Sequence, residues 1–367
     1  MSGYLLIFLW FIFLFLFAEF VDVDDEIEVN GKKKKTVKYW YALLAFVPIV
    51  YMVVYRNVNF QDTGIYVTMY RQFPESIERF QSTYNSLTKD KAFFALAMLI
   101  KIFISKDYHV YFFIIAVLHS FCLIKLFREQ SSSFLFSVFI FWVSTDCISW
   151  MFNGIRQFVA VCICLLATNW MLEKKYILSI ATVIIASFFH QSALLMIPVF
   201  LFASGKLANY KMIGIIVAVI FVILFTNQFT NILESFLEDT QYTNVVEDWT
   251  VSNDNGTNPI RVLVYSVPTI FALIGRRYIE MDDNPVITFS ANMSIISTCI
   301  YVASMFTSGI YIGRLPIYAS IYATCILLPW EIENMFNDSS SSMLKIIMAG
   351  FYLLFYYYQM HVIWGLI

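Results

Sequence analysis

Long apolar runs separated by short polar segments dominate this chain of 367 residues. A helix needs ~20 consecutive apolar residues to cross the hydrocarbon core of a bilayer, and most of these runs approach that length. The pattern therefore predicts an all-α polytopic transmembrane helical protein with about 11–12 spans. The expected spans are Tyr4–Phe20, Tyr39–Tyr55, Val110–Phe127, Phe134–Trp150, Ile155–Leu172, Tyr176–Phe189, Ser192–Ala203, Met212–Phe229, Ile260–Gly275, Val286–Phe306, Leu315–Trp330 and Met343–Trp364.

Two stretches depart from this simple pattern. Ala92–Ser105 is short for a span and contains Lys101, so we expect a re-entrant or interfacial helix that does not cross. Tyr176–Ala203 is interrupted at His190 and again at Pro198. It forms either one long helix or two short ones. Two are favoured, because they place the basic pairs of the flanking loops on the cytoplasmic side.

The charged segments suggest an orientation. No basic residue precedes the first apolar run, and lysines 32–35 and Lys38 follow it. This order favours a retained first helix over a signal peptide and places the lysines in the cytoplasm. The polar segments 56–91 and 230–259 then become outer loops of a single integral membrane domain, residues 1–367.

Composition agrees with a membrane protein. Hydrophobic residues make up 60% of the chain and charged residues 14%, and the mean hydropathy is +0.70. Soluble domains carry about 25% charged residues. A net charge of −2 gives no basic field for nucleic acid. The six cysteines lie in or beside apolar runs and fit small apolar fillers, and we expect neither a metal nor a cofactor.

Ionisable residues close to the membrane are costly and often functional. Arg156 opens a helix after Asn153-Gly154, so its guanidinium and the helix amides favour an anion such as phosphate. The alternative is an arginine that snorkels to the interface. His190 lies where the chain reverses. It serves either proton transfer and hydrogen bonding to a substrate, or the helix end alone.

Two carboxylates and three further arginines share the predicted outer side. Asp62 or Asp90 could act as a general base towards a sugar hydroxyl, or each could cap the helix that follows it. The arginines are Arg56, Arg261 and Arg314. Together with Arg156 they fit a reaction on a lipid-linked pyrophosphate sugar, because they would neutralise the departing pyrophosphate.

Four polar elements occur in a set order along the chain. They are Tyr55-Arg56 with Asp62-Thr63, Lys89-Asp90-Lys91-Ala92-Phe93, Phe152-Asn153-Gly154-Ile155-Arg156-Gln157 and Phe189-His190-Gln191-Ser192-Ala193-Leu194. Together they resemble the EpsG family of Wzy-type exopolysaccharide and O-antigen polymerases. The resemblance runs from about Trp40 to Leu201, and Arg314 resembles the family's late arginine. The chain departs from the family in having Phe60-Gln61 before Asp62, where Gly-Thr is frequent.

The resemblance implies a GT-C-like fold in the bacterial cytoplasmic (inner) membrane, with undecaprenyl-pyrophosphate-linked oligosaccharides as substrates and a chain-length regulator as partner. From the residues themselves we expect Asp62, Asp90 and His190 to serve catalysis, with Asp62 or Asp90 as the base and His190 as a positioning group. The pyrophosphate would be bound by Arg56, Arg156, Arg314, Arg261 and Gln157. Other functions stay open: a lipid-linked oligosaccharide flippase or transporter, a polysaccharide ligase, or an acyltransferase.

Overall fold

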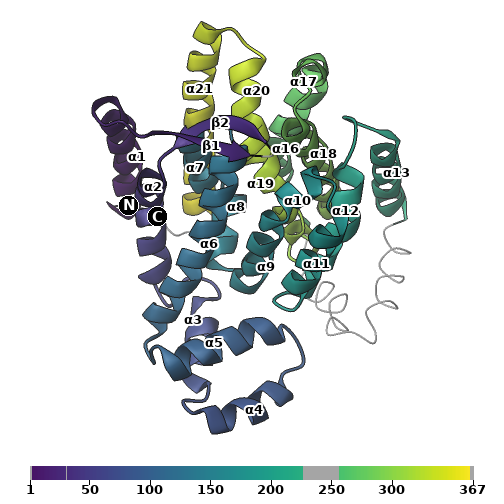
Figure 1. Cartoon of the computed structure of the whole chain (residues 1–367). Helices are drawn as coiled ribbons and strands as arrows, with labels where there is room; N and C mark the ends of the chain where they lie inside the picture. The colour runs from purple at the N-terminus through teal and green to yellow at the C-terminus, as the bar shows by residue number, and fades with distance from the viewer. Residues whose placement is uncertain (1, 30, 226–255, 364–367) are drawn as a thin grey trace. The chain divides into compact units, whose positions relative to one another are not determined.

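The computed structural model describes residues 2–29, 31–225 and 256–363 (Figure 1). The protein is 77% helical with almost no strand, which confirms the all-α polytopic membrane protein expected from the sequence. The chain falls into two compact units, each described by itself. Unit 1 comprises residues 1–194 and 336–367, and unit 2 comprises residues 195–335.

Unit 1 contains the first eleven α-helices, the two strands and the C-terminal helix. Its elements are α1 (Ser2–Phe20), β1 (Asp24–Val29), β2 (Lys32–Val37), α2 (Tyr39–Val54), α3 (Thr63–Gln72), α4 (Ile77–Ser86), α5 (Lys91–Phe103), α6 (Tyr108–Gln130), α7 (Phe134–Val143), α8 (Thr145–Phe152), α9 (Ile155–Leu166), α10 (Thr168–Leu172), α11 (Tyr176–Ser187), α21 (Asp338–Tyr357) and the π-helix η4 (Tyr358–Ile363).

Unit 2 is built around α18. The short 3₁₀-helix η1 (Gln191–Leu195) leads into it. Its elements are α12 (Met196–Ala203), α13 (Tyr210–Leu224), α16 (Pro259–Ile274), α17 (Arg276–Asp282), α18 (Pro285–Met305), η2 (Ile312–Arg314), α19 (Ile317–Ile321), the π-helix η3 (Tyr322–Leu327) and α20 (Leu328–Asn334).

Three described helices are long and apolar enough to cross a membrane alone: Tyr108–Gln130, Pro285–Met305 and Ile312–Asn334. The number rises to five if the bent pairs α7/α8 and α16/α17 each form one span. Several of the other expected spans are helices of 10–17 residues, which are too short to cross a bilayer core of ordinary thickness. The count of 11–12 spans therefore stays a prediction.

Some polar segments fold differently from what the sequence suggested. The expected outer loop 56–91 contains α3 and α4, and the end of the expected loop 230–259 begins α16, while residues 230–255 lie outside the described part of the chain. The charged segment after α1 forms a β-hairpin. Its two strands place oppositely charged residues opposite each other, with Glu26 facing Lys35 and Glu28 facing Lys33. Such cross-strand charge pairs stabilise an antiparallel hairpin.

The first helix is packed against the rest of unit 1. The Tyr41 hydroxyl donates to the Leu14 carbonyl at 2.7 Å, and the Trp10 indole donates to the Leu44 carbonyl at 3.2 Å. Both bonds join α1 to α2. The two bonds therefore hold α1 against α2 within unit 1.

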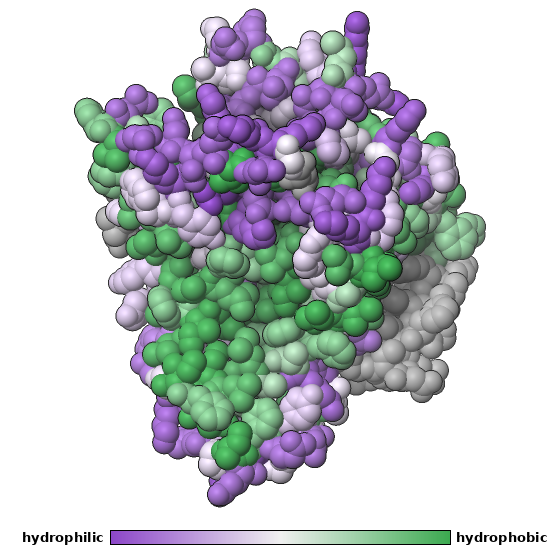
Figure 2. Space-filling model, in the orientation of Figure 1, coloured by the Kyte–Doolittle hydropathy of each residue, from purple (hydrophilic) through white to green (hydrophobic). Residues whose placement is uncertain are grey.

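Helix α6 is the central element of unit 1 and separates two polar ends. It packs against α2 and α9 along its length. At its C-terminus Arg128 binds the hairpin, and at its N-terminus Tyr108 lies beside Arg71 of α3. A helix of 23 residues is ~35 Å long, close to the thickness of a bilayer core. Figure 2 shows hydrophobic side chains between the polar hairpin and the polar α3–α5 end.

Candidate functional site

The loop before α3 is tied to the junction between α8 and α9. The backbone N–H of Asp62 donates to Oδ1 of Asn153 at 3.2 Å, and the ring of Phe60 meets that of Phe152 edge-on at 5.9 Å. The two hydrogen-bonded residues are 91 positions apart in the chain. These contacts bring two of the four polar elements found in the sequence together.

Gly154 allows α9 to begin against an aromatic ring. A Cβ atom at this position would lie 2.7 Å from Cε3 of Trp150, closer than real Cβ contacts allow. Only glycine fits without a shift of the ring or the backbone. The glycine thereby lets the chain turn tightly from α8 into α9 and places Arg156 in the first turn of α9.

Arg156 forms an ion pair with Asp90. Its Nη1 lies 2.6 Å from Oδ2 of Asp90, whose side chain is 3% exposed, whereas that of Arg156 is 28% exposed. Burial raises the pKa of Asp90 because desolvation of the carboxylate outweighs the attraction of Arg156. The second oxygen, Oδ1, is buried and has no hydrogen-bond partner among the described residues.

Neither carboxylate is used as a helix cap. Asp62 precedes α3 and Asp90 precedes α5, but neither side chain makes a capping hydrogen bond. The capping alternative is therefore wrong for both residues. Their environments differ: Asp62 is exposed, and Asp90 is buried.

Tyr66 lies close to both Arg56 and Arg156. Its buried hydroxyl is hydrogen-bonded to Arg156 and also interacts electrostatically with Arg56 and Asp62. Burial raises the pKa of Tyr66, so the phenol stays protonated. Tyr66 lies one helical turn after Asp62 on α3, which places the exposed carboxylate, both arginines and the phenol in one neighbourhood.

Within the described part of the chain, Arg56 has no acidic partner. Its Nε donates to Oγ1 of Thr63 at 2.9 Å, and its guanidinium carbon lies 4.1 Å from the ring centre of Phe112. Nη1 and Nη2 are buried and have no hydrogen-bond partner among the described residues. Burial lowers the pKa of Arg56 to about 10, which leaves it charged at neutral pH. Arg56 therefore brings to the site a buried positive charge and two donor groups that no described residue uses.

The turn that carries His190 lies beside the start of α5. The Ala92 N–H donates to the Phe188 carbonyl at 3.1 Å, and the ring of Phe189 packs against the aromatic core beneath the site. Nδ1 of His190 lies 2.7 Å from the hydroxyl of Ser192. This contact orients the ring within the turn. The bond between Ala92 and Phe188 places the fourth polar element next to the second.

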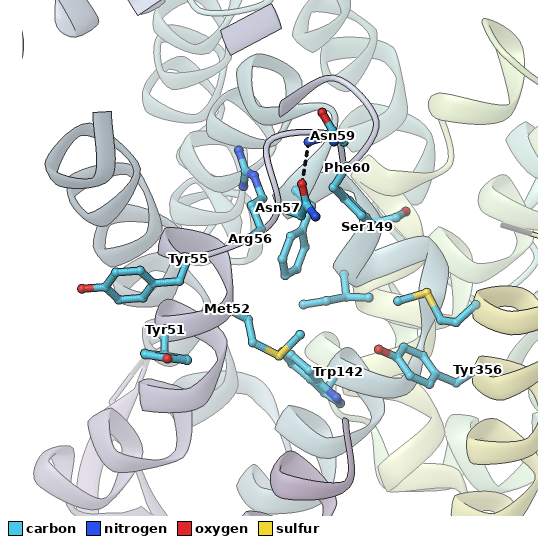
Figure 3. Close-up of a pocket in the computed structure, with 13 residues that line it drawn as sticks. Tyr51, Met52, Tyr55, Arg56, Asn57, Asn59, Phe60, Trp142, Ser149 and Tyr356 are labelled. Atoms are coloured by element: carbon cyan, nitrogen blue, oxygen red, sulfur yellow. Dashed lines mark hydrogen bonds between the residues drawn. The ribbon is translucent and has the colours of Figure 1, made fainter. Parts of the chain in front are cut away.

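A cavity of about 450 Å³ opens beside Arg56 in unit 1. It lies between the end of α2, the loop 55–62, the α7–α8 bend and the C-terminal helix. Figure 3 shows Arg56, Asn57 and Asn59 at one end and Met52, Trp142 and Tyr356 at the other. The cavity therefore has a polar, cationic end and an apolar, aromatic end.

A family model for the EpsG family matches residues 39–364, nearly the whole chain. This chain belongs to the EpsG family. The family consists of Wzy-like polymerases. No curated protein and no solved structure matches the chain.

In this EpsG-family chain, the remaining predicted site residues lie in different places. Gln157 is buried in the first turn of α9. Arg261 and Arg314 belong to unit 2, where residues 256–257 pack directly on residues 304–313 and so bring both arginines to the same end of that unit. Their convergence with Arg56 and Arg156 stays a prediction, since it joins two separately described units.

Sequence reasoning missed several neighbours of the arginines. Thr63, Tyr66 and Phe112 contact Arg56 or Arg156, yet only Thr63 appears within a recognised motif. Tyr66 could have been found from its spacing, because it follows Asp62 by four residues on a helix. Phe112 gave no signal, since it is one of 37 phenylalanines in an apolar run.

Proposed function

We propose that this protein is a glycosyltransferase that joins undecaprenyl-pyrophosphate-linked oligosaccharide repeat units into a polysaccharide. The reaction would occur on the outer face of the bacterial cytoplasmic membrane. The donor is the growing chain on its lipid pyrophosphate, and the acceptor is a single lipid-linked unit. Membership of a family of Wzy-like polymerases supports the class of reaction.

The observation that carries the proposal is the pair of arginines around Tyr66. Arg156 shares its charge with Asp90, but Arg56 has two unused N–H₂ groups and no acidic partner among the described residues. Buried donors without acceptors are costly, so the arrangement favours an anion that binds both groups. A diphosphate has enough oxygens to accept from both arginines at once.

The cavity supports a lipid-linked diphosphate. A prenyl diphosphate sugar is polar at one end and apolar at the other, and so is the cavity. Its diphosphate would lie at the Arg56 end. The first isoprene units would lie between Met52, Trp142 and Tyr356.

The two carboxylates then have different roles. Asp62 is exposed and lies next to the arginines, so it is placed to take the proton from the acceptor hydroxyl as its oxygen bonds to the anomeric carbon of the donor. The bond from that carbon to the diphosphate oxygen breaks, and the arginines stabilise the charge left on the diphosphate. Asp90 is covered by protein and holds Arg156 in position.

The test uses a deletion strain complemented with Arg56→Ala or Arg156→Ala. Each variant should reach the membrane in normal amounts and slow polymer growth by about 100-fold or more, so that single repeat units accumulate. Arg71→Ala is the matched control, because Arg71 is an exposed arginine on the same polar end whose guanidinium lies 5.4 Å from the Tyr108 ring. The readout is the lipid-linked and surface glycan profile.

The same profile separates the alternatives. Polymer of normal length in both arginine variants would remove them from the site. A strain that lacks a flippase would display no surface sugar. A strain that lacks a ligase would keep finished polymer on the lipid carrier. Only loss of a polymerase leaves single units on display.

A further inference from the structure

Unit 2 contains a buried acid that the polymerase proposal does not use. Glu331 lies in α20 and is 0% exposed, and neither carboxyl oxygen has a hydrogen-bond partner among the described residues. No described lysine, arginine or histidine lies within ion-pair distance of it. An ionised carboxylate in such a place is very unfavourable, whereas a protonated carboxyl is tolerated far better.

The surrounding helix pair has more polar groups without partners. The hydroxyls of Ser320 and Thr324 on the same long helix, and of Ser290 and Ser297 on α18, are buried and unpartnered within the described chain. The pairs lie four and seven residues apart, so on each helix they share a face. Helix α18 packs extensively against η3, which holds Thr324.

The level of these groups follows from contacts at the helix ends. Ser304 of α18 and Gly313, at the start of the long helix, both lie against Thr257, so α18 runs antiparallel to that helix. The ring of Phe289, next to Ser290, lies 5.4 Å from that of Tyr322. Ser290 therefore lies close to the level of Ser320 and Thr324, and Glu331 follows further along the same long helix.

The backbone here is also irregular. Residues Tyr322–Leu327 form a π-helix, and Glu331 follows it directly in the next turn. π-Helical turns are rare and occur often at functional sites, because they displace side chains from regular helical positions. In the most apolar stretch of the long helix Ile312–Asn334, 94% of the residues are buried. The polar side chains of this stretch therefore face protein and not lipid.

We propose that Glu331 is a proton-binding site: the folded protein holds one proton on this buried carboxyl. The proposal is independent of the polymerase reaction and concerns unit 2 alone. Loss of the proton would place an unpaired charge in α20, which packs on α16, and so loosen the packing of these two helices. The packing of unit 2 would therefore respond to pH.

Other titratable groups on the packed elements do not explain such a response. The elements in closest contact with α20 are η3 and α16, and α18 packs on η3. Arg276 and Arg277 follow α16, are exposed, and Arg276 pairs with Glu280. The ionisable residues on these elements are Arg261, Tyr265, Cys299, Tyr301, Tyr322, Cys325 and Glu333, none of which forms an ion pair with Glu331 among the described residues.

The experiment compares thermal unfolding of the purified full-length protein with that of Glu331→Gln over a range of pH. Glutamine matches the size of the protonated acid and cannot ionise. If folding retains the proton, the two proteins have similar stability in acid. The unfolding equilibrium of the wild type then rises up to tenfold per pH unit relative to the variant, above the usual range for a carboxyl. Glu333→Gln, a less buried neighbour, should follow the wild type.

Infrared spectroscopy provides a second readout that does not depend on unfolding. The wild type at neutral pH should show a protonated-carboxyl C=O band that is absent from Glu331→Gln and present in Glu333→Gln. A stability offset that is constant with pH, or equal carboxyl bands in wild type and Glu331→Gln, would overturn the proposal. Neither result bears on the polymerase reaction, which the glycan profile tests separately.

Discussion

Arg56 illustrates how a charged side chain can be held by its uncharged contacts. Thr63 binds its Nε and Phe112 covers the face of its guanidinium, so the two terminal nitrogens remain for a ligand. A tightly paired arginine would have to break an ion pair before it could bind a phosphate. Arg156, which Asp90 holds in place, and Arg56, which is free of acids within the described chain, therefore complement each other.

Substitution of Gly154 should disturb the start of α9. Gly154→Ala places a methyl group 2.7 Å from the Trp150 ring, so the ring or the start of α9 must move. We expect a loss of stability of about 1–3 kcal/mol and a marked loss of polymerisation, because Arg156 moves with α9. Gly350→Ala is the control, since nothing lies within 4 Å of a Cβ there and the helix should gain ~1 kcal/mol. Equal effects of both substitutions, measured by thermal unfolding and glycan length, would contradict this account.

Asp90 should determine the acid side of the pH dependence. Its pKa is raised by burial, so below that pKa the carboxyl is neutral and loses its ionic hold on Arg156. Polymerisation in isolated membranes should therefore fall by about tenfold per pH unit below it. Asp90→Asn should be slower at neutral pH and lack this limb.

The sign for stability is the opposite. Because the folded state keeps the proton of Asp90 to higher pH than the unfolded state, the wild type loses stability relative to Asp90→Asn as the pH rises from the ordinary value of 3.8 through the raised pKa. Thermal unfolding across this range checks the direction. Parallel curves for the two proteins would show that Asp90 ionises normally.

At the scale of elements, Arg128 of α6 makes three contacts with the hairpin and the residues that follow it. Arg128 donates to the Val37 carbonyl at 2.9 Å, pairs with Asp25 at 2.6 Å and lies over the Tyr39 ring. A short two-stranded hairpin is marginally stable by itself. We therefore expect the contact between Arg128 and the hairpin to hold the hairpin against α6.

Arg128→Gln should release the hairpin. We expect trypsin to cleave at the lysines of β2 several times faster in this variant, because a partly buried ion pair and a backbone hydrogen bond are lost. Lys125→Gln is the matched control. Lys125 lies one turn earlier and pairs with Glu129 of the same helix at 2.6 Å, so this ion pair does not join the hairpin to α6. Equal cleavage rates in the two variants would show that Arg128 does not hold the hairpin.

At the scale of the whole molecule, the two polar ends of α6 should face opposite sides of the membrane. The positive-inside bias places the lysine-rich hairpin in the cytoplasm and α3–α5 outside. In a protein with Arg79→Cys, a membrane-impermeant maleimide should label intact cells. Lys33→Cys should react only after the cells are permeabilised. The native cysteines give little background, because five of the six are buried. Labelling of both from one side would contradict the topology.

The sequence by itself determined the class of the protein and most of its polar site. Long uninterrupted apolar runs and low charge predict a helical membrane protein, because a helix satisfies its backbone hydrogen bonds within one apolar segment. The polar residues that interrupt the apolar runs, Arg56, Asp62, Asp90, Arg156 and His190, are costly there, so they were visible as candidates before any contact was known.

Only the tertiary structure decided how these residues are paired. Contacts such as Arg156 with Asp90 and Asp62 with Asn153 join positions 66 and 91 residues apart, and no local pattern encodes which partner is chosen. The same reason explains why the buried Glu331 and the β-hairpin went unnoticed. Whether a charge is paired, covered or exposed depends on neighbours that folding brings from elsewhere in the chain.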